Sequence, residues 1–182
     1  MPKNHVSLPD QEDHTGRQEP ASLQPSPSLQ DKDTGAETGI DKECVFCQIA
    51  AGTIPGHLIF EDNLCVVLLD IHPANPGHLL IIPKKHYPIM PLVPDSVVHH
   101  LFSVVQKMSK ALLHALSSEG ATILIANGKS AGQKAPHAMI HLIPRKEGDG
   151  LALSLPVRDF PPEVLQAAGE KIYQEVQKKL ST

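Results

Sequence analysis

Two histidines, His137 and His141, flank Met139 in a short apolar segment, Pro136-His-Ala-Met-Ile-His-Leu-Ile-Pro144. The alternation predicts a β-strand, whose period of two places these three side chains on one face. The other face carries residues that suit a hydrophobic core, namely Ala138, Ile140 and Leu142. Imidazoles gathered on one sheet face can bind a metal, move protons or attack an electrophile. The alternative is a pair of half-buried histidines without chemistry.

A second pattern, Cys44-Val-Phe-Cys47, brings two thiols within reach of one tetrahedral metal ion, which needs two further ligands from elsewhere. A pair of reduced thiols on a helix and a redox-active C-x-x-C are the alternatives. The third cysteine, Cys65, lies in an apolar strand and is interpreted as a small buried hydrophobe. Cysteines in this arrangement fit a reducing compartment better than a disulfide framework, so the expected location is the cytoplasm.

Periodicity and turn residues predict the elements that position these side chains. A short helix is expected at Cys44–Ala51, and the longest helix opens at Pro94-Asp95, with Asp95 as its N-cap and Gly120 at its end. Strands are expected at residues 57–60, 64–69, 78–82, 121–126 and 138–143, of which the first two form a hairpin. A mostly antiparallel sheet with helices on one face, an α+β fold, is therefore predicted.

The ends of the chain differ from its middle. Residues 1–42 contain no aromatic residue and hold four Lys or Arg against eight Asp or Glu, so this segment is expected to be disordered. Residues 43–155 are assigned to one folded domain, and residues 156–182 to a helical extension that docks on the domain or on a second subunit. From residue 43 onward the charges balance, which argues against bulk nucleic acid as a partner. No apolar run is long enough for a membrane span.

Five motifs taken together resemble the histidine-triad (HIT) superfamily of nucleotide-binding proteins and hydrolases. In chain order they are Cys44-Val-Phe-Cys47, Leu69-Asp-Ile71, Gly77-His-Leu-Leu-Ile-Ile-Pro-Lys-Lys-His86, Asn127-Gly-Lys-Ser-Ala-Gly-Gln133 and the segment Pro136–Pro144. The resemblance implies a HIT-like fold, with a five-stranded antiparallel sheet, one long helix and a C-terminal helix. Family members carry His-x-His-x-His, whose central histidine attacks the α-phosphorus. Here that nucleophile position is Met139, and His141 is the remaining catalytic candidate.

The resemblance also implies a metal site and a nucleotide site. In the zinc-carrying branch, the ligands of a closed, structural zinc site match Cys44, Cys47, His86 and His137. A ribose diol would donate hydrogen bonds to Asp70. The α-phosphate would contact Asn127, Gly132, Gln133 and His141. An apolar slot for the base would be built from residues that are otherwise ordinary core: Val45, Phe46, Ile49, Leu68 and Ile71.

Three functions remain open at this point. The first is a purine-nucleotide-binding protein related to nucleoside phosphoramidate and dinucleoside polyphosphate hydrolases, with absent or much reduced activity because a thioether is a weak nucleophile toward phosphorus. The second is an active hydrolase or transferase with an altered mechanism, or a nucleophile-substituted form of one. The third is a structural zinc-stabilised domain. Relatives pair through the long helix and an edge strand, so a homodimer is expected.

Overall fold

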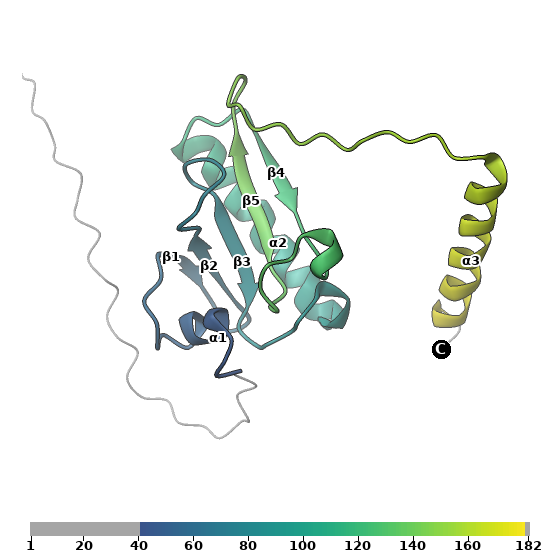
Figure 1. Ribbon diagram of the computed structural model, residues 1–182. Coiled ribbons are helices and arrows are strands. Elements are labelled where there is room, and N and C mark those ends of the chain that lie inside the picture. The colour runs from purple at the N-terminus through teal and green to yellow at the C-terminus, as the bar shows by residue number, and fades with distance from the viewer. Residues whose placement is uncertain (1–40, 181–182) are drawn as a thin grey trace, which may run out of the picture. The chain divides into compact units, whose positions relative to one another are not determined.

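The computed structural model describes residues 41–180, in which a five-stranded sheet is the central element (Figure 1). The strands are β1 (Leu58–Glu61), β2 (Cys65–Leu69), β3 (Leu79–Pro83), β4 (Gly120–Leu124) and β5 (Ile140–Arg145). They lie in the order β1-β2-β3-β5-β4, and every neighbouring pair is antiparallel. The helices are α1 (Val45–Ala50), α2 (Asp95–Ala115) and α3 (Pro162–Leu180), with 3-10 turns at Met90–Leu92 and Lys129–Ala131. The predicted α+β fold is confirmed.

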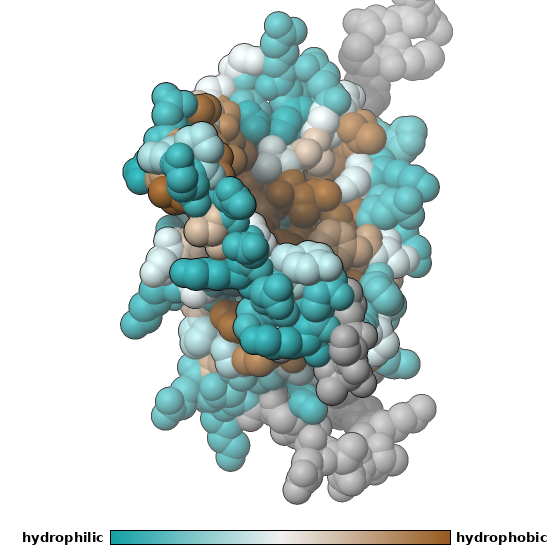
Figure 2. Space-filling model, turned by 90° about the vertical axis from the view of Figure 1, so that its right-hand side faces the viewer, coloured by the Kyte–Doolittle hydropathy of each residue, from teal (hydrophilic) through white to brown (hydrophobic). Residues whose placement is uncertain are grey.

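The outer strand β4 carries exposed apolar side chains at one edge of the sheet. Ile123 and Leu124 are 48% and 44% exposed, and Phe102 and Leu113 of α2 are exposed as well. Figure 2 looks at the molecule from the right-hand side of Figure 1 and shows apolar atoms gathered in a patch with polar atoms around it. An apolar edge strand with free backbone groups is a place where a second chain can pair.

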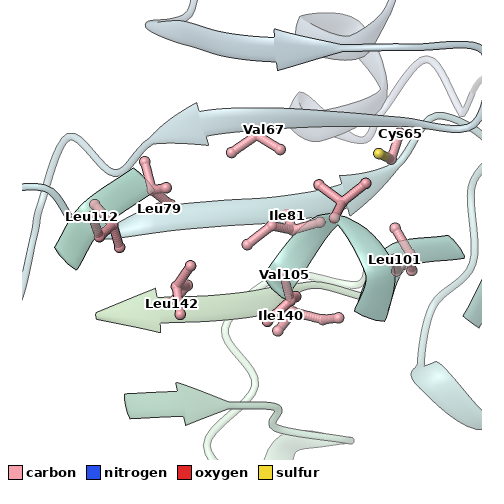
Figure 3. Close-up of a cluster of buried hydrophobic side chains, with 10 residues drawn as sticks. Cys65, Val67, Leu79, Ile81, Leu101, Val105, Leu112, Ile140 and Leu142 are labelled. Carbon is pink, nitrogen blue, oxygen red and sulfur yellow. The ribbon is translucent and has the colours of Figure 1, made fainter. Parts of the chain in front are cut away.

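One face of the sheet packs against α2 through buried apolar side chains (Figure 3). This core comprises Cys65, Val67, Leu79, Ile81, Ile140 and Leu142 from the sheet and Leu101, Val104, Val105 and Leu112 from α2. Alternate strand residues contribute because side chains two positions apart share a face. Full burial of one such aliphatic side chain contributes about 1.5–3 kcal/mol. The predicted burial of Cys65, and of Ile140 and Leu142 on one face, is confirmed.

The opposite face of the sheet packs against α1, so the expectation that the helices share one face is wrong (Figure 1). Buried residues of this face are Val66, Leu68 and Ile82, against which Phe46, Ile49, Ala50 and Met139 pack. Both β2 and β3 are apolar at every position. A strand that is apolar on both sides needs a cover on each side, and α1 supplies the second one.

The ends of α2 differ from their prediction. Pro94, with φ −58° and ψ 144°, is the N-cap residue, and Asp95 is the first residue inside the helix. A carboxylate in this first turn still stabilises the helix, because it faces the positive end of the helix macrodipole. The helix ends at Ala115, and Gly120 begins β4 instead of ending the helix.

Two predicted segments lie at the ends of the chain. The predicted disordered segment, residues 1–42, falls almost entirely outside the described residues. The predicted extension, residues 156–182, contains α3, and its exposed apolar side chains include Val164, Leu165, Ile172, Tyr173 and Val176. What these side chains contact stays a prediction. Within residues 41–180, no helix combines the length and the apolar character needed to cross a membrane.

Candidate functional site

Several predicted site residues lie on the face of the sheet that packs against α1, because side chains two positions apart along a strand point to the same face. Met139 packs on this face, and His141, two residues later, points the same way. On the neighbouring strand, Leu80 is the register partner of His141. The backbone N–H of Asp70 donates to the carbonyl oxygen of His78 at 2.9 Å, which extends the β2–β3 ladder beyond the end of β2. The side chains of Asp70, His78 and His141 therefore come together on adjacent strands.

Cys44, Cys47, His86 and His137 form a second cluster, whose potential ligand atoms all lie within 4.8 Å of one another. Sγ of Cys44 lies 3.4 Å from Nδ1 of His137. Sγ of Cys47 lies 3.3 Å from Nδ1 of His86 and 3.5 Å from Nδ1 of His137. Cys44 is the N-cap of α1 and Cys47 lies in its first turn, so the C-x-x-C spacing presents both thiols from one helix start.

This donor set fits a tetrahedral ion. Zn–S bonds of about 2.3 Å and Zn–N bonds of about 2.1 Å at tetrahedral angles place sulfur and nitrogen about 3.5 Å apart. The three sulfur–nitrogen distances agree with that separation, and both rings present Nδ1. Burial lowers the pKa of His137, which keeps its ring neutral and able to coordinate. Burial also raises the pKa of the Cys47 thiol to about 11, so a bound cation must displace that proton.

His78 links Asp70 to His141. Its Nε2 lies 3.0 Å from Nδ1 of His141, and its Nδ1 lies 3.4 Å from Oδ2 of Asp70. The backbone N–H of Ala74 donates to the same Nδ1 at 3.2 Å. Burial lowers the pKa of both histidines, and the carboxylate of Asp70 opposes this effect in each. Both rings are therefore neutral near pH 7, and Nε2 of His141 is the nitrogen that remains to face a ligand.

The loop from Asn127 to Gln133 is held together by its own side chains. Oδ1 of Asn127 accepts a hydrogen bond from the backbone N–H of Met90 at 2.9 Å. Oε1 of Gln133 accepts from the backbone N–H of Gly128 at 2.6 Å, and its Nε2 donates to the carbonyl oxygen of Pro88 at 2.7 Å. These amides shape the loop that precedes β5, while their contacts with a phosphate stay a prediction.

Gly132 and Lys134 complete this loop. Gly132 has a φ of 86°, a left-handed conformation that residues with a Cβ rarely adopt. Lys134 is exposed, and its positive charge adds to the effect of burial in lowering the pKa of His141. The loop thus brings the positive charge of Lys134 near His141, the histidine predicted to contact the α-phosphate.

Three of the five residues predicted for the base slot lie together with Met139. Phe46 and Ile49 of α1 and Leu68 of β2 belong to the same apolar cluster. Leu68 is only 4% exposed, which also suits an ordinary core position. Val45 and Ile71 are 45% and 72% exposed, and neither is part of this cluster.

Two histidines have partners that the sequence did not predict. His78 belongs to a motif but received no role, although its spacing from Leu80 and Ile82 places all three on the α1 face. His100 of α2 is half-buried, and its Nε2 lies 2.7 Å from Oδ2 of Asp62. That partner comes from the β1–β2 turn, so the pattern within α2 carries no signal for it.

The HIT domain family model matches residues 51–148. This chain belongs to the HIT domain family. An adenylylsulfatase from Arabidopsis thaliana is 43% identical over 119 residues, which cover 65% of this chain and only 60% of that protein's length. An adenosine 5′-monophosphoramidase from Schizosaccharomyces pombe is 34% identical over 134 residues, or 73% of this chain and 98% of the relative.

One solved structure that is similar to this chain contains a metal ion. The crystal structure of a zinc-bound histidine triad family protein from Mycobacterium smegmatis has a TM-score of 0.58 and 34% identity. It covers 72% of this chain, and this chain covers 96% of it. In the present chain, Cys44 and Cys47 lie just before the matched span of residues 51–148, whereas His86 and His137 lie within it.

Proposed function

We propose that this HIT domain binds a purine nucleotide on the α1 face of its sheet and hydrolyses it slowly or not at all. Two relatives, named as an adenylylsulfatase and an adenosine 5′-monophosphoramidase, support a nucleotide hydrolase-like function with an adenosine phosphate derivative as the ligand. The reduced activity follows from Met139, which we place at the nucleophile position of the family.

The position of Met139 is the observation that carries this proposal. Its side chain packs against Val66, Leu68 and Ile82, on the face that His141 shares. A neutral imidazole there could attack phosphorus and later leave again, whereas a thioether is a weak nucleophile without a proton to exchange. The pocket would therefore keep its shape and its ligand while losing the covalent step.

The nucleotide would lie across the residues that the sequence assigns to it. We propose that Asp70 accepts the ribose hydroxyls, and that the base lies against Val45, Phe46, Ile49, Leu68 and Ile71. The α-phosphate would meet His141 and the loop that contains Asn127, Gly132 and Gln133. A carboxylate has about four lone-pair sites. Asp70 uses one for the backbone N–H of His72, at 2.9 Å, so acceptor capacity remains for a diol.

Titration calorimetry and a turnover assay on the same protein test the proposal. We expect adenosine monophosphate to bind in the micromolar-to-millimolar range, roughly −8 to −4 kcal/mol. Adenosine 5′-phosphoramidate should be turned over slowly or not at all. Absence of binding would refute the nucleotide site, and rapid turnover through a nucleotidyl-protein intermediate would refute the assignment of Met139.

We further propose that Cys44, Cys47, His86 and His137 hold one structural zinc ion. The four ligands leave no coordination position for water, so the ion would tie the start of α1 to the exit of β3 and the entry of β5. The zinc-bound relative from Mycobacterium smegmatis supports this assignment. Cys44, Cys47 and Cys65 form no disulfide, which fits a reducing compartment, so the cytoplasm is the proposed location.

A homodimer is the proposed assembly. The β4 edge and the adjacent surface of α2 expose apolar side chains, among them Ile123, Leu124 and Phe102. Pairing of two β4 edges would satisfy their free backbone groups and cover this surface. Light scattering at micromolar protein should give the mass of two chains, and a monomer mass would remove the proposal.

A second candidate function is an active hydrolase with an altered mechanism. The contact between His78 and His141 favours it, because a neutral, oriented imidazole at the phosphate position is able to act on water.

A further inference from the structure

Asp70, His78 and His141 form a chain that the metal cluster does not use. Asp70 and His141 lie against opposite nitrogens of the His78 ring, at 3.4 Å from Nδ1 and 3.0 Å from Nε2. His78 is only 5% exposed, so its ring is fixed between its two partners. Each nitrogen of the His78 ring faces one partner, which is the in-line order that proton transfer requires.

We propose that this chain is a proton relay in which His141 activates a water molecule for direct attack on the α-phosphorus, with His78 as its positioning residue. The inference rests on the proposed nucleotide site. It supplies a reaction that needs no nucleophile at Met139, since water takes the place of the missing imidazole.

The contacts of His78 determine which nitrogen of His141 carries the proton. When Ala74 donates to Nδ1 of His78, Nε2–H of His78 donates to His141, and His141 presents an N–H to a phosphate oxygen. When His78 carries its proton on Nδ1, facing Asp70, it accepts from Nδ1–H of His141 instead. His141 then presents a lone pair on Nε2, which is the form that a general base requires.

The reaction is balanced without a further reactant. The water oxygen forms a bond to the α-phosphorus, and the bond from phosphorus to the leaving atom breaks with its electron pair on that atom. Nε2 of His141 takes the water proton, and the resulting imidazolium gives it to the leaving atom. With a phosphoramidate, the products are the nucleoside monophosphate and the amine. The negative charge of Asp70, acting through His78, stabilises the imidazolium in between.

Charged and titratable groups reach the His141 ring from three elements. His78 immediately precedes β3, Asp70 immediately follows β2, and Lys134 lies in the loop before β5. Lys134 and burial favour the neutral ring, whereas Asp70 favours the charged one. The His141 ring is therefore neutral at neutral pH, and turnover should fall as acid protonates it. The base form is reached when the proton of His78 lies on Nδ1, facing Asp70, in place of the contact with the N–H of Ala74.

The test compares the 182-residue chain, purified without chelator, with its variants His141→Asn, His78→Asn and His99→Asn, using adenosine 5′-phosphoramidate. The wild-type chain should show slow turnover above the buffer rate, and His141→Asn should lose it by ~100-fold or to background. His78→Asn should lose at least ~10-fold and shift the acidic limb of the pH profile, with adenosine monophosphate affinity nearly kept. His99 is an exposed histidine of α2, and its variant should behave as wild type.

Stereochemistry separates this reaction from the covalent route. Direct attack by water on a chiral phosphorothioate analogue should invert the configuration at phosphorus, whereas two successive displacements would retain it. Retention, a wild-type rate in His78→Asn, or turnover that depends on added divalent metal would each overturn the relay. Turnover at background with intact adenosine monophosphate binding would overturn the relay while leaving the proposed binding function in place. Loss of adenosine monophosphate binding would instead refute the proposed binding function.

Discussion

Nε2 of His137 lies 2.9 Å from the carbonyl oxygen of Pro83, the last residue of β3. A ring N–H that donates to a backbone carbonyl fixes the imidazole tautomer and turns Nδ1 toward the opposite side. That side faces the thiols of Cys44 and Cys47. The β3 backbone therefore orients His137, a proposed metal ligand from the segment before β5.

Zinc content should follow this cluster. The wild-type protein, purified without chelator, should carry about one zinc per chain by elemental analysis. Cys47→Ser should lose the metal and melt at a clearly lower temperature, because binding free energy at a closed site is folding free energy. Cys65→Ser is the matched control: this buried thiol lies in the α2-facing core and should keep the zinc while losing some stability. A folded wild-type protein without metal would contradict the proposal.

Sequence patterns predicted the features that depend on neighbouring residues in the chain. They failed for features that depend on contacts between segments far apart in the sequence. The alternation of Ala138 to Leu142 specified both faces of β5, since each side chain follows from a period of two. The N-cap at Pro94 was missed because Asp95 is equally favourable one residue later, inside the first turn. The position of α1 was missed although β2 and β3 are apolar on both faces, because such runs show that a second cover is needed but not which segment supplies it.

At the candidate site, too, some contacts were predicted from the sequence and others were not. The motifs predicted that Cys44, Cys47, His86 and His137 come together. They did not reveal that the amide of Gln133 is bonded to the backbone of its own loop. They also did not reveal the contact between His78 and His141, because the register of β3 against β5 is set by tertiary packing and not by either strand alone.

Asp70 should discriminate ribose from deoxyribose. Its carboxylate accepts one backbone N–H from His72 and retains acceptor sites, so a vicinal diol can donate to it. Asp70→Ala should weaken binding of adenosine monophosphate by about 1–2 kcal/mol and weaken deoxyadenosine monophosphate less. Calorimetry with both nucleotides on both proteins gives the comparison. Equal losses for the two ligands would show that the ribose hydroxyls lie elsewhere.

The contact of Asp62 with His100 should make stability depend on pH in the acidic range. Burial opposes ionisation of Asp62, but N–H groups of Leu64 and Cys65 together with His100 outweigh it and lower its pKa to about 2. A carboxyl whose pKa falls on folding stabilises the protein above its unfolded pKa, near 4, and loses that contribution as pH falls toward 2.

The expected contribution of Asp62 is on the order of 1–2 kcal/mol. Urea unfolding at pH 4.5 and pH 2.5 should therefore show a smaller loss of stability in Asp62→Asn than in the wild-type protein. His100→Asn should remove only part of the difference, since the two backbone donors remain. An unchanged pH dependence in Asp62→Asn would place the acid-sensitive carboxyl elsewhere.

Replacement of Met139 by histidine is the sharpest test of the nucleotide site. The two side chains have similar reach, and Met139 already lies on the face that His141 shares, against the apolar cluster beside α1. A histidine there would supply a neutral imidazole that can attack the α-phosphorus. Met139→His should raise turnover of adenosine 5′-phosphoramidate by at least ~100-fold, about 2.7 kcal/mol of transition-state stabilisation.

A histidine nucleophile should form a covalent nucleotidyl intermediate, which a side chain that only improves packing cannot form. Intact mass measured during turnover should show a nucleotidyl adduct on Met139→His and none on Met139→Leu, which keeps the apolar contacts without the imidazole. Both variants should bind adenosine monophosphate like the wild-type chain. A gain in Met139→Leu would attribute the effect to packing. No gain in Met139→His, with binding intact, would mean that this face has diverged beyond its nucleophile, and it would favour a protein that only binds its nucleotide.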